Sequence, residues 1–107
     1  MDARAAAQKG DVGALKRIAQ SSPTSFSIPD NNGWTPFHEA VRLGNLPAVK
    51  VILESDAKLL DLLTFTGVTP LNIAREYLGK NHPVAQYLVE WGAIDKHPHH
   101  NMNNNEL

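Results

Sequence analysis

Cysteine is absent from the 107 residues, which excludes disulfide bonds, thiolate metal ligands and thiol nucleophiles. No apolar run approaches the roughly 20 residues of a membrane-spanning helix, and residues 1–10 lack the apolar core of a secretory signal. Neither sign of charge dominates, since 10 Lys and Arg stand against 11 Asp and Glu. Without a basic stripe a protein is poorly suited to bind a phosphate backbone. We therefore expect no nucleic-acid partner, no membrane partner and an intracellular location, cytoplasmic or nuclear.

Motifs for nucleotide and metal chemistry are also missing. Neither GxGxxG nor GxxxxGK[ST] occurs in the chain, so the glycines do not form a phosphate-binding loop. His97, His99 and His100 lie close together, but no rigid element or further shell of residues orients them, and we expect only weak, adventitious metal binding. The sequence therefore predicts no cofactor and no metal site.

One pattern occurs twice, 34 positions apart. Residues 30–40 read DNNGWTPFHEA, and residues 64–74 read TFTGVTPLNIA. In each copy a Gly two residues before Thr-Pro supplies the positive φ of a tight turn. Thr35 and Thr69 then fit as helix N-caps, each followed by a Pro at the first helical position, where no hydrogen bond is lost. The pattern predicts a helix that begins after each of these threonines.

A second, amphipathic helix is predicted after each first one. Gly44 and Gly79 are expected to end the first helices as left-handed residues, and Pro47 and Pro83 fall in the first turns of the second helices. The second helices carry apolar stripes at helical spacing, namely Leu46, Val49, Ile52 and Leu53, and Val84, Tyr87, Leu88 and Trp91. A related set lies 34 positions upstream of the first copy, at Ala6, Gly10, Asp11, Leu15 and Ile18. The sequence therefore predicts three helix pairs.

These residues resemble the ankyrin-repeat family, whose repeat of about 33 residues carries a Thr-Pro-apolar-His core. The resemblance implies an all-α solenoid of about three stacked helix-turn-helix units with short hairpin-like turns. We expect one domain over residues 1–95. It comprises an N-terminal cap repeat at 1–29, a second repeat at 30–63 and a third at 64–95. Residues 96–107 lack apolar periodicity and are expected to form a disordered, His- and Asn-rich tail.

The third repeat departs from the family pattern. Asn72 stands where the motif has His, so the usual bond from that His to the Thr must be made differently. Residues 78–82 are expected to hold extra residues in the turn between the two helices. In the second repeat, residues 58–63 replace the family's hairpin residues, and we expect a short helical extension there.

The resemblance implies a protein-interaction module that binds a protein or peptide on the concave face of the stack. The alternative is a regulatory segment of a larger multidomain protein or enzyme, with no catalysis of its own. A nucleophile and base formed by Thr35, His38 and Glu39 is a weaker hypothesis, because the helix start already explains Thr35 and His38. We expect no catalytic residue, and a chain that is monomeric or part of a longer one.

Matching the two copies position by position places a set of residues on the concave face. These are Asn31, Asn32, Trp34, Arg42, Leu43, Phe65, Thr66, Val68, Glu76 and Tyr77. Aromatic and Arg side chains concentrate at the centres of protein interfaces, which favours Trp34 as an anchor. For Trp34 and Phe65 a structural role, that of covering a neighbouring turn, remains the alternative.

Overall fold

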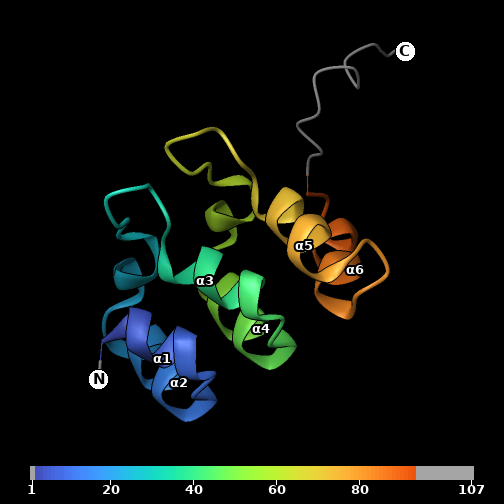
Figure 1. Ribbon diagram of the computed structural model, residues 1–107. Helices are drawn as coiled ribbons and strands as arrows, with labels where there is room; N and C mark the ends of the chain where they lie inside the picture. Colours follow the sequence, from blue (N-terminus) through green and yellow to red (C-terminus); the bar gives the residue numbers. More distant parts are fainter. Residues whose placement is uncertain (1, 94–107) are drawn as a thin grey trace.

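Three pairs of α-helices follow one another along the described part of the chain (Figure 1). The structure is a computed structural model, and it describes residues 2–93. The pairs are α1 (Ala3–Lys9) with α2 (Val12–Ser21), α3 (Pro36–Leu43) with α4 (Leu46–Ser55), and α5 (Pro70–Leu78) with α6 (Pro83–Glu90). Two 3-10 helices, η1 (Pro23–Ser27) and η2 (Ala57–Asp61), follow the first two pairs. The predicted all-helical fold and the extension near residue 58 are confirmed, whereas the predicted tail lies outside the described residues.

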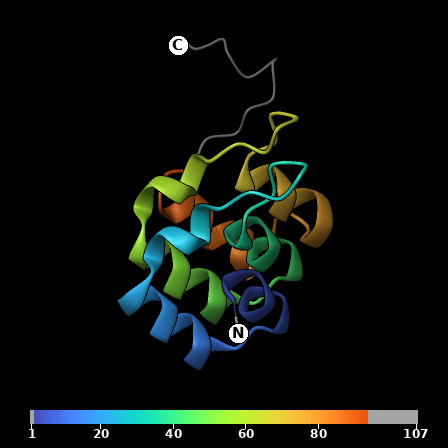
Figure 2. The ribbon, with the colours of Figure 1, turned by 90° about the vertical axis from the view of Figure 1, so that its left-hand side faces the viewer.

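The pairs stack in register, with first helices against first helices and second against second. α3 packs between α1 and α5, and α4 between α2 and α6. The two long turns, 28–35 and 62–69, project on the same side of the stack (Figures 1 and 2). This arrangement gives two helical layers and a row of turns beside the first helices.

The first helices begin at the predicted residues. The Thr35 hydroxyl accepts the His38 N–H at 3.2 Å, and the Thr69 hydroxyl accepts the Asn72 N–H at 3.1 Å. Each Thr is followed by a proline in the first turn, as the sequence predicts. These contacts satisfy N–H groups that have no partner inside the helix.

Only one of the two predicted left-handed helix ends is correct. Gly44 has φ 74° and ψ 21°, in the left-handed region. Gly79 has φ 95° but ψ 149°, which lies outside that region, so the prediction for Gly79 is wrong. The reason lies in the longer turn: residues 79–82 separate α5 from α6, whereas Gly44 and Asn45 alone separate α3 from α4. The extra residues therefore lie where the sequence places them.

Replacing Thr35 or Thr69 by Val is expected to lower the free energy of unfolding by about 1 kcal/mol, the usual cost of a lost N-cap. Valine keeps the volume of the side chain but removes the hydroxyl oxygen that accepts the first-turn N–H. Thermal unfolding followed by circular dichroism measures the effect. Unchanged melting curves for both variants would contradict the helix starts described here.

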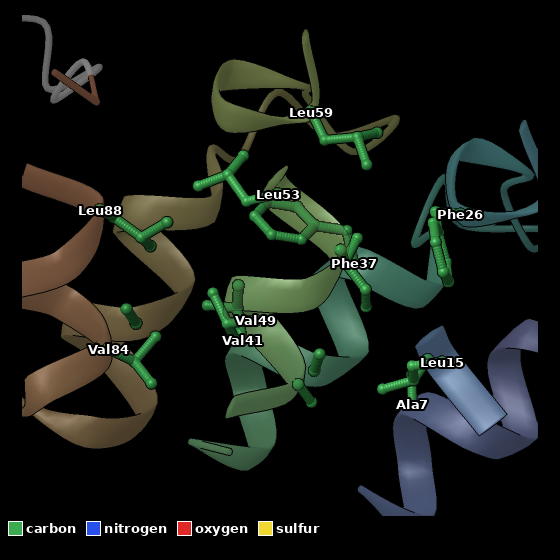
Figure 3. Close-up of a cluster of buried hydrophobic side chains, with 14 of the residues drawn as sticks. Ala7, Leu15, Phe26, Phe37, Val41, Val49, Leu53, Leu59, Val84 and Leu88 are labelled. Carbon is green, nitrogen blue, oxygen red and sulfur yellow. The ribbon is translucent and has the colours of Figure 1, made fainter. Parts of the chain in front are cut away.

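A single apolar core runs through all three pairs (Figure 3). Its members include Ala7 and Leu15 from the first pair, Phe37, Val41, Val49 and Leu53 from the second, and Val84 and Leu88 from the third. Within the predicted stripes, Leu46, Ile18 and Tyr87 are only partly buried and Trp91 is exposed. Because each repeat buries its apolar face against its neighbour, the stability of the stack depends on the contacts between repeats.

A buried histidine joins the start of α3 to the second long turn. The His38 Nδ1 atom accepts the Thr35 backbone N–H at 2.9 Å, and its Nε2 atom lies 2.7 Å from the Leu62 carbonyl oxygen. The Thr35 N–H must be a donor, so Nε2 carries the proton and donates to Leu62. Burial lowers the pKa of His38 below its ordinary value of 6.5, although the bond to Leu62 acts in the opposite direction. The ring is therefore held in its neutral form.

The stability of the protein is expected to fall between about pH 7 and pH 5 because of His38. Its pKa is lowered on folding, so the unfolded chain binds the proton more readily than the folded chain. The contribution of His38 is complete above the unfolded value of about 6.5 and is lost as the pH falls toward the lower folded value. Denaturant unfolding at a series of pH values measures this loss.

His38→Asn is the matched control, since Asn72 occupies the equivalent position of the third repeat. The variant retains His82 and every carboxylate, so the difference between the two pH profiles isolates His38. Identical slopes between pH 7 and pH 5 would show that His38 is not buried in its neutral form.

Candidate functional site

The predicted concave-face residues fall into two groups in the structure. Four of them line one hollow of about 340 Å³ between the first long turn and the first helices, namely Asn32, Trp34, Arg42 and Tyr77. Asp30 and Glu39 complete its lining. The other predicted residues do not line it: Asn31, Leu43, Phe65, Thr66, Val68 and Glu76. Among these six only Val68 is partly buried, and the others are exposed.

Trp34 forms one wall of this hollow and also supports the fold. Its ring lies 6.3 Å from the Tyr77 ring at 87°, an edge-to-face arrangement, and 6.0 Å from the His38 ring. The indole is partly buried and packs against the apolar core. Tyr77, by contrast, is 56% exposed. The two rings therefore form one aromatic surface, and Tyr77 is the more exposed of the two.

Phe65 connects the second long turn to the first. Its side chain is 69% exposed, but its backbone N–H donates to the Asn32 carbonyl at 3.0 Å. A Cβ atom at Gly33 would collide with the backbone and ring of Phe65. The second long turn therefore rests directly on the first, and Phe65 covers Gly33.

Arg4, which the sequence analysis did not single out, contacts two of the charged residues that line the hollow. Arg4 Nη1 lies 3.9 Å from Asp30 Oδ2 and 3.8 Å from Glu39 Oε2, and Arg42 Nη2 donates to Glu39 Oε1 at 3.1 Å. The Trp34 backbone N–H donates to Asp30 Oδ1 at 2.9 Å and lowers the pKa of the Asp30 carboxyl below its ordinary value. The charge of Arg4 also lowers this pKa. Two carboxylates thus face two guanidinium groups.

Arg4 in the first repeat and His38 in the second make equivalent hydrogen bonds to the backbone. Arg4 stands 34 positions before His38, and its Nη2 atom donates to the Ile28 carbonyl at 3.1 Å and the Trp34 carbonyl at 2.8 Å. Ile28 in turn stands 34 positions before Leu62, the acceptor of His38. Extending the period backward from His38 would have identified Arg4 from the sequence.

Within residues 2–93, no group of three or more His, Cys, Asp or Glu side chains could hold a metal ion. Both ring nitrogens of His38 are already engaged in the fold. No helix in the described part of the chain is long and apolar enough to cross a membrane. The three tail histidines lie outside the described residues.

Substitution of two equivalent glycines will measure the contact between the turns. Gly33 and Gly67 share φ 82°, so alanine at either introduces the same left-handed strain, about 1 kcal/mol. At Gly67 no described heavy atom lies within 4 Å of the new Cβ, whereas at Gly33 the Cβ meets Phe65. We expect Gly33→Ala to cost about 1 kcal/mol more than Gly67→Ala. Equal losses in chemical denaturation would contradict the packing of one turn on the other.

Comparison with known proteins gives one family and several longer relatives. The family described as ankyrin repeats (3 copies) matches residues 4–100. The chain is 45% identical over 67 residues to the probable 26S proteasome regulatory subunit p28 of Saccharomyces cerevisiae, which covers 61% of the chain and 28% of that protein. It is 38% identical over 72 residues to a transient receptor potential cation channel subfamily A member 1 homolog of Caenorhabditis elegans. This match covers 67% of the chain and 6% of that protein.

A human protein, ankyrin repeat and SOCS box protein 3, is 29% identical over 91 residues. This match covers 82% of the chain and 17% of the human protein. The chain thus spans less than a third of the length of each of these three relatives.

Proposed function

Because the chain belongs to the ankyrin-repeat family, we propose that it binds a protein or peptide through its concave surface, centred on the hollow beside Trp34. Ankyrin repeats are non-catalytic protein-interaction modules, and helical repeat stacks present extended concave surfaces for this purpose. The observation that carries the proposal is the convergence of Trp34, Tyr77 and Arg42 on one hollow. These are the residue types that dominate binding energy at interfaces.

The polar part of the hollow supports recognition of a peptide backbone or a polar side chain. Arg42 donates one hydrogen bond from Nη2 to Glu39 and is only partly buried. Its other N–H groups can therefore donate to acceptors of a partner. Asn32 adds an exposed amide at the rim. The remaining predicted residues, including Leu43 and Glu76, would contribute a surrounding contact area.

A second proposal, that the chain acts as part of a longer protein, rests on the end of the stack. Val89 in α6 is equivalent to Leu53 in α4, because Val89 stands four residues before Ala93 and Leu53 stands four residues before the matching Ala57. Leu53 is fully buried, whereas Val89 is 50% exposed. A further repeat or domain would cover Val89, and the three relatives are all much longer than the matched segment. An intracellular setting is part of the same proposal, in keeping with the proteasome subunit among the relatives.

Site-specific photo-crosslinking tests the concave surface. A photoreactive phenylalanine analogue replaces Tyr77 on the hollow or, as a control, Lys16, which is exposed on α2 and outside it. We expect a discrete protein adduct from position 77 in an extract of the source cells, lost in the presence of excess unmodified protein and absent from position 16. Identical adducts from the two positions would place the binding surface elsewhere.

A further inference from the structure

A second hollow, of about 450 Å³, lies at the N-terminal end of the stack. It opens between the start of α1, the end of α2 and the segment around η1, and it shares no lining residue with the hollow beside Trp34. Ala3, Ile18 and Pro36 give it an apolar floor, and Ile28 is exposed at its side. Its volume is within the range of pockets that bind small ligands.

The repeat period explains why this hollow exists. Ala3 stands 34 positions before Phe37, and Ser25 stands 34 positions before Leu59. In the second repeat Phe37 and Leu59 are buried in the core (Figure 3). Two further lining residues have apolar counterparts in the second repeat, because Ile18 corresponds to Ile52 and Ile28 to Leu62 by the same count. The first repeat thus has apolar walls like those of the second repeat, with two small side chains where the second repeat has two large ones.

The geometry points to this hollow as a second binding site, one that takes the side chain of a phenylalanine from a partner peptide. At the equivalent positions of the second repeat, the side chains of Phe37 and Leu59 are buried in the core, so the walls match groups of that size and polarity. Burial of an aromatic ring is the usual anchor of a peptide in such a pocket. The site is additional to the concave surface, and its test does not depend on that surface.

Hydroxyl groups and charge define what can lie beside the ring. Ser21, Ser22 and Ser25 belong to the lining and can exchange hydrogen bonds with a peptide backbone. Of the two ionised lining groups, Arg4 faces Asp30 and Glu39 and donates to two carbonyls, whereas Asp2 is exposed. The mouth therefore favours a peptide that is uncharged or basic next to its phenylalanine.

Titration with N-acetylphenylalanine amide, followed by the NMR signals of the Ile18 and Ile28 methyl groups, tests the proposal. We expect saturable shifts with a dissociation constant of about 1 mM, as for a fragment of this size. N-acetylalanine amide, which lacks the ring, should give shifts at least about ten-fold weaker at equal concentration. An absence of saturable shifts, or equal responses to the two amides, would overturn the proposal.

Filling the hollow provides the matched variants. Ala3→Phe and Ser25→Leu each introduce the side chain of the second repeat and should abolish the response to the phenylalanine amide. Either should also raise the melting temperature by about 5 °C, as cavity filling commonly does. Gln8→Leu, which adds apolar volume on the exposed side of α1 outside the hollow, should change neither. If Ala3→Phe fails to fold, Ser25→Leu decides alone, and a Ser25→Leu protein that still binds the probe would refute the assignment.

Discussion

Phe37→Ala will lower the free energy of unfolding by about 4 kcal/mol, the usual cost of removing a fully buried aromatic side chain. Phe37 has no exposed surface and lies in the middle repeat, so its ring contacts the core on which both neighbouring repeats depend. A domain of this size has a total stability of about 5–15 kcal/mol. The variant is therefore expected to unfold at a much lower denaturant concentration, with a broader transition if the two ends of the stack become uncoupled.

Phe65→Ala is the matched control for this experiment. The chemical change is the same, but Phe65 is 69% exposed and contributes mainly by covering Gly33. We expect its loss to cost about 1 kcal/mol or less. Equal midpoints of denaturant unfolding for the two variants would show that Phe37 is not part of the shared core.

Local chemistry explains which parts of the fold were predictable from the sequence. Thr35 and Thr69 needed only their own hydroxyls and the following prolines to define helix starts, because a cap is a contact within one turn. The period of 34 residues then placed the helix pairs. Gly79 was misassigned because its conformation is set by the length of the turn that follows, which the identity of the residue does not reveal.

The candidate site was less predictable because its features depend on packing between repeats. Trp34 was expected at the surface, yet it is half-buried against His38 and Tyr77, and only the stacking of the third repeat brings the Tyr77 ring to it. Arg4 was missed because an arginine in the first repeat does not resemble the motif histidine, although it makes the equivalent bond. Ala3 gave no signal at all. The small side chain of Ala3 can be recognised as part of a hollow only when the surrounding residues are known from the structure.

The binding energy of the concave surface is expected to concentrate in Trp34. Trp34→Ala should weaken binding of the protein identified by crosslinking by about 2 kcal/mol or more, roughly thirty-fold in Kd. Loss of the indole removes one wall of the hollow and the edge-to-face support of Tyr77. Because Trp34 also packs on the core, the variant should lose some stability, so binding must be measured well below its melting temperature.

Tyr77→Ala separates the two roles of this surface. Tyr77 is 56% exposed and its removal should leave the unfolding midpoint nearly unchanged, while binding weakens by about 1 kcal/mol or more. Lys16→Ala, on the exposed side of α2, should alter neither quantity. If Trp34→Ala loses stability but binds normally when folded, and Tyr77→Ala also binds normally, then Trp34 serves the scaffold alone. The partner would then have to be sought on another face, because the rings would be close together for reasons of packing between repeats.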